Sequence, residues 1–278
     1  MNIRRGNRRL RDLPVNSLIP NILTVLALCA GMSAIRFAMQ GKWELAVAAI
    51  IVAGILDGLD GRMARLLKGA TKFGAELDSL SDFIAFGVAP ALVIYMWSTE
   101  SLGGVGWIAG LAYSTCCALR LARFNTALTE PDRPAWSSLF FTGMAAPAGA
   151  FTVLLPLIIN FQFGISFLQE PIFMALWFLV VAFMMISRIP TYSLKLVRVK
   201  REMVLPVLVI VGIVAAVLAS YPWLVFSVLG VLYLSSIPFS YRAHKRLLET
   251  QLGVNEARLP EKESSAEVNS EADNKELL

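Results

Sequence analysis

Residues 57–82 read DGLDGRMARLLKGATKFGAELDSLSD, and the rest of the chain is best understood outward from this stretch. It contains two pairs of aspartates, three and four residues apart: Asp57 with Asp60, and Asp78 with Asp82. On helices these spacings place both members of a pair on one face. Long apolar runs flank the two pairs, so the four carboxylates are expected at or near the depth of the lipid hydrocarbon.

Carboxylates at that depth need a compensating charge. A charged side chain costs roughly 2.5–3.5 kcal/mol there on insertion scales, and clustered carboxylates also repel one another. A divalent cation resolves both problems, and the absence of His and Cys from residues 57–82 favours hard cations such as Mg²⁺ or Mn²⁺ over structural zinc. The stretch therefore predicts a metal site. A cation or proton pathway in a transporter is the alternative.

Composition predicts an all-α, polytopic membrane bundle. The chain has 278 residues, of which 56% are hydrophobic and 16% charged, and its mean hydropathy is +0.64. The single histidine lies beyond the last apolar run, so acid–base chemistry within the membrane region falls to carboxylates. We predict about eight transmembrane helices, at residues 18–38, 43–61, 74–97, 104–121, 140–160, 170–187, 203–220 and 222–241.

Charge in the loops predicts the orientation. Twenty of the 25 Lys and Arg residues lie on one side of the predicted membrane, whereas the other side has only Arg36 and Lys42. By the positive-inside rule both termini are cytoplasmic, and so are the ends of the second and third spans that carry the aspartates. We expect a multi-pass protein of the bacterial inner membrane.

Three domains follow from these patterns: a cytoplasmic basic arm at 1–17, a membrane catalytic domain at 18–246 and a tail at 247–278. The tail has eight Asp or Glu and no aromatic residue, which predicts a disordered acidic cytoplasmic segment. The rest of the chain carries 22 Lys or Arg against 12 Asp or Glu. Such a basic face suits anionic lipid and phosphate ligands, and no nucleic-acid partner is expected.

Polar residues beside the aspartates have two interpretations each. Asn21 and Thr24 are three residues apart and share a face of the first span, either as a capped helix start or as a patch facing a ligand. Gly61 allows close helix packing or the approach of a phosphate to backbone. Arg65 follows four residues later and can lean toward the carboxylates, where a guanidinium suits a bidentate phosphate grip.

The pattern Asp57-x2-Asp60-Gly61-x2-Ala64-Arg65-x8-Gly74-x3-Asp78-x3-Asp82 resembles the complete signature of the CDP-alcohol phosphotransferase family. Residues 20–24 resemble the first-helix element of that family. The resemblance implies a membrane enzyme that cleaves a CDP-linked donor, releases CMP and transfers the phosphoalcohol to an acceptor hydroxyl. It further implies a six-helix core, to which this chain adds two spans, two divalent ions (Mg or Mn) and a homodimer.

The resemblance also implies roles for individual residues. The metal ligands would be Asp57, Asp60, Asp78 and Asp82, with Asp57 and Asp78 bridging the two ions. Asp82 would also be the catalytic base that accepts the proton of the acceptor hydroxyl, unless it is a metal ligand alone. The residues expected to bind CDP-diacylglycerol are Asn21, Thr24, Gly61, Arg65, Thr71 and Gly74.

Residues 118–125, with the sequence ALRLARFN, resemble an element of the integral-membrane phosphatidylserine synthase subgroup, as do residues 143–148 and 189–195. This implies transfer of a phosphatidyl group from CDP-diacylglycerol to the hydroxyl of L-serine, in phospholipid biosynthesis. Arg120 and Asn125 would bind serine, whereas the alternative for Arg120 is a charge that only orients the chain. Glycerol phosphate, inositol and choline remain alternative acceptors.

Overall fold

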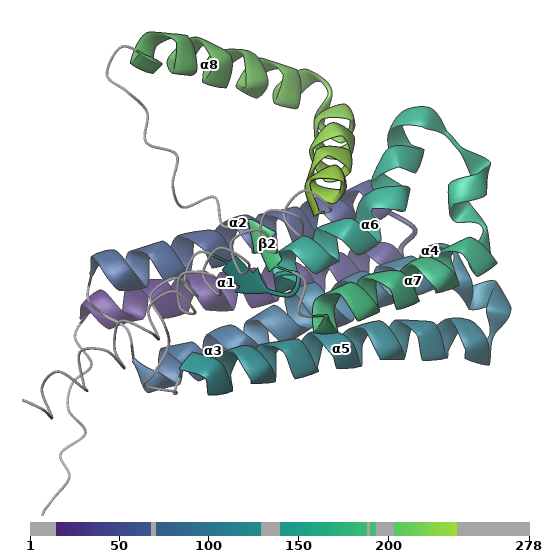
Figure 1. The fold of residues 1–278 in the computed structure, drawn as a ribbon, viewed down its shortest axis with the longest axis horizontal. Coiled ribbons are helices and arrows are strands. Elements are labelled where there is room, and N and C mark those ends of the chain that lie inside the picture. The colour runs from purple at the N-terminus through teal and green to yellow at the C-terminus, as the bar shows by residue number, and fades with distance from the viewer. Residues whose placement is uncertain (1–14, 68–70, 129–139, 188–189, 193–202, 238–278) are drawn as a thin grey trace, which may run out of the picture.

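The computed structural model describes residues 15–67, 71–128, 140–187, 190–192 and 203–237 (Figure 1). The predicted acidic tail and all but the last three residues of the predicted basic arm lie outside these ranges. The helices are α1 (Val15–Met39), α2 (Trp43–Leu66), α3 (Lys72–Asp82), π-helical η1 (Phe83–Val88), α4 (Ala89–Trp97), η2 (Thr99–Leu102), α5 (Gly104–Leu128), α6 (Ala146–Phe163), η4 (Ser166–Gln169), α7 (Pro171–Ile186) and α8 (Val204–Ser220). A last helix covers Pro222–Ile237.

The prediction of an all-α membrane bundle is confirmed. The described residues contain one small exception, an antiparallel ladder of β1 (Phe140–Thr142) with β2 (Pro190–Tyr192). This ladder joins the chain before α6 to the chain after α7. It falls at one end of two apolar helices, where the sequence has no strand-like alternation.

The number of membrane-spanning helices differs from the predicted eight. By length and apolar composition, four described helices can cross a membrane, at Leu18–Met39, Lys72–Trp97, Gly104–Thr126 and Ala146–Phe163. Helix α2 carries several charged residues at its site end, and α7 has only 16 residues. The last two predicted spans are bent by 119° between Ser220 and Pro222, so they count as one span at most.

Small residues allow α1, α2 and η1 to pack closely. Helices α1 and α2 lie side by side along most of their length (Figure 1). A Cβ atom added to Gly31 of α1 would lie 2.8 Å from the Cα of Ala85 in η1, so only glycine allows this crossing. Ala34, Ala46 and Ala53 are fully buried along the same contacts. This is the small-residue packing typical of membrane helices.

The π-helical turn η1 directly follows Asp82 and is held by α5. The hydroxyl of Tyr113 donates a 2.7 Å hydrogen bond to the carbonyl of Phe86, and Ser114 Oγ donates to the carbonyl of Gly87 at 3.1 Å. A π-helical turn leaves carbonyl groups without their usual partners, and these two hydroxyls satisfy them. The junction between α3 and α4 is therefore fixed by polar contacts inside the bundle.

The two C-terminal helices differ in their surroundings. Helix α8 lies apart from the bundle in Figure 1, and its apolar side chains are exposed on all sides. Such a helix suits a lipid environment. The helix at Pro222–Ile237 instead packs on α6 through ring contacts of Trp223 with Phe161 and of Phe226 with Phe151.

Candidate metal and substrate site

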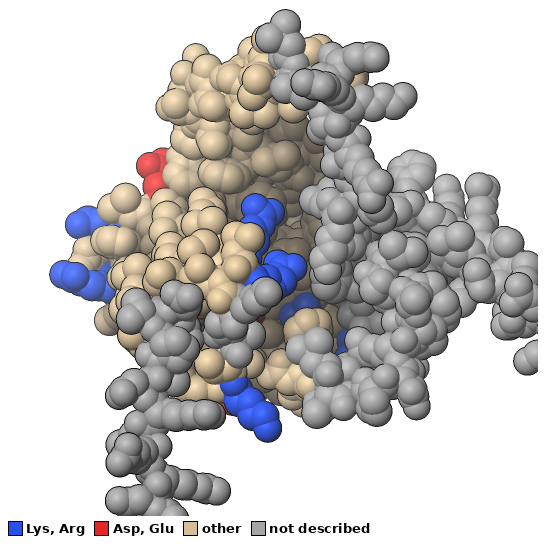
Figure 2. All heavy atoms as spheres, turned by 90° about the vertical axis from the view of Figure 1, so that its left-hand side faces the viewer, with Lys and Arg blue, Asp and Glu red and all other residues tan. Residues whose placement is uncertain are grey.

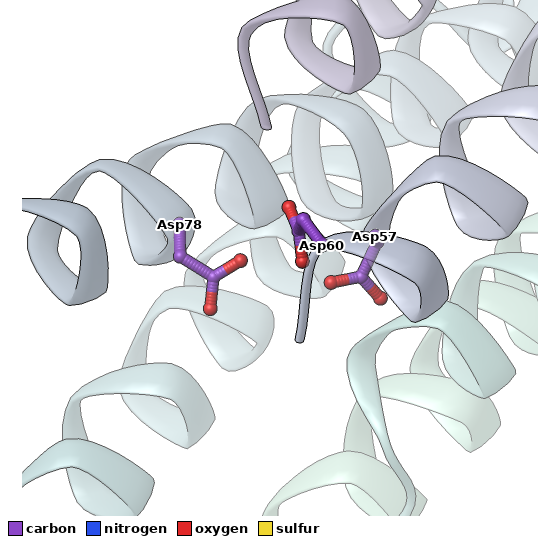
Figure 3. A group of neighbouring side chains, drawn as sticks. All are labelled: Asp57, Asp60 and Asp78. Atoms are coloured by element: carbon purple, nitrogen blue, oxygen red, sulfur yellow. The ribbon is translucent and has the colours of Figure 1, made fainter. Parts of the chain in front are cut away.

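Three of the four predicted metal ligands meet at one point. Asp57 and Asp60 come from α2 and Asp78 comes from α3, and each offers a carboxylate oxygen within 4.8 Å of the other two (Figure 3). Asp82 lies one helical turn beyond Asp78, within hydrogen-bonding range of Asp57. The spacing within each helix places its aspartates on one face, and in the fold the two faces lie against each other.

This donor set fits a hard divalent cation. It consists only of carboxylate oxygens, which Mg²⁺ and Mn²⁺ prefer. Asp60 is only 5% exposed, and Asp57 and Asp78 are half-buried. Because a cluster of buried carboxylates needs a compensating charge, the geometry agrees with the predicted metal site.

Helix α1 closes the site from a third side. Thr24 Oγ1 donates a 2.6 Å hydrogen bond to Asp60 Oδ2, which orients that carboxylate. The backbone carbonyl of Thr24 in turn accepts a 3.0 Å hydrogen bond from Ser81 Oγ of α3. One residue of α1 thus contacts both aspartate-bearing helices. The sequence did not predict that Thr24 bonds to Asp60 and Ser81, although it predicted that Asn21 and Thr24 share a face of the helix.

A pocket of about 180 Å³ lies directly beside the carboxylates. It is lined by three helices and the turn before α3, through Pro20, Asn21, Thr24, Asp60, Gly61, Ala64, Thr71, Gly74, Ala75 and Asp78. Five of the six residues predicted to bind CDP-diacylglycerol line this pocket. The sixth, Arg65, is exposed, and its Nε donates to the carbonyl of Gly61 on its own helix at 2.9 Å.

The two glycines of the pocket have different surroundings. A Cβ atom on Gly74 would lie 2.8 Å from Asn21 Oδ1, so Gly74 allows the start of α3 to approach α1. The hydroxyl of Thr71 caps the same turn by accepting from the Gly74 amide at 3.0 Å. A Cβ atom on Gly61 would meet nothing within 4 Å, so this glycine keeps space open in the pocket.

Arg120 and Arg123, both within residues 118–125, have different surroundings. Arg123 Nη1 donates to the carbonyl of Ile186 at 3.0 Å and so binds the C-terminal end of α7, where a cation is favourable. Arg120 lies in electrostatic contact with Asp82 and Asp57. Its buried Nε has no hydrogen-bond partner among the described residues. An unpartnered buried donor beside the carboxylates points to a ligand group.

Asn125 was predicted to bind serine, and its Nδ2 donates to Ser79 Oγ at 2.7 Å. It therefore ties α5 to α3 next to Asp78. The other two elements that resemble the serine-using subgroup lie next to each other, because β2 at residues 190–192 pairs with β1, which directly precedes Gly143. Gly143 has a φ of +83°, and a Cβ atom there would lie 2.7 Å from the carbonyl oxygen of Ser187 and 3.4 Å from Arg123 Nη2 of α5.

The site end of the bundle is basic. Figure 2 views this end, with Lys and Arg side chains placed around a hollow between the helices. Arg62, Arg65 and Lys72 belong to the ends of α2 and α3 beside the pocket. A cation-rich entrance favours anionic head groups and phosphates.

The fold and the site define a multi-pass membrane protein with a carboxylate centre suited to divalent ions and a pocket beside it. A family model described as CDP-alcohol phosphatidyltransferase matches residues 17–186. A second one, described as CDP-alcohol phosphatidyltransferase 2, matches residues 202–238. The chain belongs to the CDP-alcohol phosphatidyltransferase family.

Curated relatives cover most of the chain. A CDP-diacylglycerol–serine O-phosphatidyltransferase of Mycobacterium leprae is 41% identical over 86% of this chain and 79% of its own length. The protein of the same name from Mycobacterium tuberculosis is 39% identical over 84% of this chain and 81% of its own. That of Helicobacter pylori is 33% identical over 73% and 84%.

Proposed function

We propose that this protein is a CDP-diacylglycerol–serine O-phosphatidyltransferase, which transfers the phosphatidyl group of CDP-diacylglycerol to the hydroxyl of L-serine and releases CMP. The observation that carries the proposal is the juxtaposition of the three-carboxylate cluster with the buried, unpartnered Nε of Arg120. Relatives with this printed name, at 33–41% identity over most of the chain, support the choice of substrates.

The donor occupies the pocket between α1, α2 and α3. Asn21, Thr24 and Thr71 offer polar groups, and Gly61 leaves open space next to them. Arg65 stands at the rim, where its remaining guanidinium donors are free to turn toward a phosphate. The diacylglycerol part remains in the lipid, because the helices around the site expose apolar side chains.

Asp57, Asp60, Asp78 and Asp82 would hold two divalent ions, Mg²⁺ or Mn²⁺. When bound, these ions neutralise the pyrophosphate and the charge that develops on it during transfer. The chain contributes the positions of the ligands: Thr24 orients Asp60, and the packing of α1 on α3 sets the separation of the two aspartate pairs.

Serine reacts by one direct displacement. Its hydroxyl oxygen forms a bond to the phosphorus of the phosphatidyl group, the bond from that phosphorus to CMP breaks, and CMP leaves. Asp82 accepts the hydroxyl proton, the role that the family resemblance implies for it, and residues 57–82 contain no His or Cys that could do so. Arg120 pairs with the serine carboxylate, and its contact with Asp82 places the amino acid beside the base.

The enzyme acts in a cell membrane as a homodimer with both termini and the site on the cytoplasmic side, where serine and nucleotides are available. The basic residues at the site end support this orientation. The basic residues at 1–17 contribute to this orientation, and the acidic tail at 247–278 follows the catalytic domain in sequence.

Purified protein given CDP-diacylglycerol and a panel of alcohols tests the proposal. We expect CMP and phosphatidylserine with L-serine, in a reaction that stops when EDTA is added. CMP release with glycerol phosphate, inositol or choline but not with serine would place the protein elsewhere in the family. No CMP release with any acceptor would favour a transporter instead.

A further inference from the structure

The helix at Pro222–Ile237 is held against the bundle by one face. Trp223 and Phe226 stack on rings of α6 with centroid distances of 4.9 and 6.2 Å. Gly230 comes so close to α6 that a Cβ atom there would lie 2.3 Å from Leu155 Cδ1. Tyr233 follows Gly230 by three residues, so it continues the same face toward the site end.

Tyr233 reaches the surroundings of Arg120. It is half-buried and packs against the main hydrophobic core, one turn before the buried Ile237. The phenol interacts electrostatically with the guanidinium of Arg120, and Arg120 interacts electrostatically with Asp82 of α3. The last helix therefore brings a polar group into the electrostatic surroundings of the carboxylate centre.

One polar group of this pair is a buried donor without a partner. Arg120 Nε has no hydrogen-bond partner among the described residues. Buried donors normally have partners, so this atom indicates that an acceptor group of a ligand binds there. The half-buried Tyr233 phenol interacts electrostatically with the same guanidinium, which brings a second donor toward that acceptor.

We propose that Tyr233 is a specificity-determining residue of the acceptor pocket, whose hydroxyl donates to the same carboxylate of the acceptor that Arg120 binds. The last helix then completes the site rather than only adding a membrane span. This inference rests on the proposed function, since it assigns the recognition of a carboxylate-bearing alcohol.

The test compares Tyr233→Phe with Tyr221→Phe. Tyr221 lies at the bend before the same helix and is 61% exposed, so its variant is the matched control. In Tyr233→Phe we expect the KM for L-serine to rise about two- to tenfold, the effect of one hydrogen bond, with the kcat and the donor KM unchanged. Tyr221→Phe should match the wild type.

Serinamide, in which a neutral amide replaces the carboxylate, gives a second measurement on the same proteins. The ratio of kcat/KM for serine to kcat/KM for serinamide should fall in Tyr233→Phe. In the double variant with Arg120→Gln, this ratio should fall by less than the product of the two single effects, because both groups bind one carboxylate. A merely structural role would leave this ratio unchanged.

An unchanged serine KM in Tyr233→Phe, or an equal rise in the donor KM, would overturn the inference while leaving the proposed function intact. Wild-type protein that does not use serine at all would overturn both. The two failures are therefore distinguished in one assay.

Discussion

Thr24 of α1 donates a 2.6 Å hydrogen bond to Asp60 of α2, across 36 positions of sequence. The threonine hydroxyl also donates to the carbonyl of Pro20 at 3.0 Å, so it is shared between its own helix and the carboxylate. This contact makes α1 part of the site, because it fixes the orientation of a predicted metal ligand from outside the ligand set.

Replacing Thr24 tests that orientation. Thr24→Val keeps the shape but removes the hydroxyl, and we expect the Mg²⁺ or Mn²⁺ concentration for half-maximal activity to rise by about 10- to 100-fold. Thr24→Ser is the control, because it retains the donor. Metal titrations of both variants at saturating substrates provide the measurement, and a normal titration in Thr24→Val would contradict the role.

Asp57 is expected to be indispensable for activity and dispensable for folding. Asp57→Asn should lower the kcat by about 100-fold or more, since it weakens the carboxylate set that binds the ions. The helices should remain intact, because helix packing at α2 depends on buried alanines. Activity assays measure the loss of turnover, and circular dichroism checks that the helices remain. Wild-type turnover at low Mg²⁺ or Mn²⁺ would show that Asp57 is not a ligand.

Gly61 is predicted to leave space for the donor. A side chain placed there enters the pocket, and overpacking typically costs about 1–3 kcal/mol, so Gly61→Leu should raise the donor KM about 5- to 150-fold. Gly58→Leu is the matched control: Gly58 also has nothing within 4 Å of an added Cβ atom, but it does not line the pocket. Equal effects of the two variants would argue against donor binding at this position.

Asp82 is assigned two functions that can be separated. As the general base it should contribute about 10²- to 10⁴-fold to the rate, which saturating metal cannot restore. We therefore expect Asp82→Asn and Asp82→Ser to remain impaired at high Mg²⁺ or Mn²⁺ while donor binding persists. Recovery to near-normal kcat with excess metal would identify Asp82 as a ligand only.

Much of the fold followed from hydrophobic patterning, because each long apolar run formed a helix in the described chain. The number of membrane spans could not be predicted in the same way. The apolar sequence on either side of Tyr221 does not indicate whether the two helices are collinear or bent, and in the structure they are bent by 119°. The ladder at β1 and β2 was also hidden, because its pairs are 48 or more residues apart and depend on how α6 and α7 return.

The candidate site was predictable where residue spacing on one helix decides the outcome. The aspartate pairs and the shared face of Asn21 and Thr24 are of this kind. Arg65 was expected to lean toward the carboxylates, yet it contacts Gly61 four residues earlier, a carbonyl equally within its reach. Tyr233 gave no signal, since one tyrosine in an apolar run does not indicate which helix it will meet.

The π-helical turn at η1 has a consequence for the phase of the helix that carries Asp78 and Asp82. Each residue of an α-helix turns the chain by about 100°, so the wider turn at Phe83–Val88 offsets the faces before and after it. The aspartates can then face α2 while Val93 and Trp97 face the core. Deleting one residue within η1 would convert it to an ordinary α-helical turn and rotate the part before it relative to α4. The carboxylates of Asp78 and Asp82 would then point away from Asp57, although no ligand had been changed.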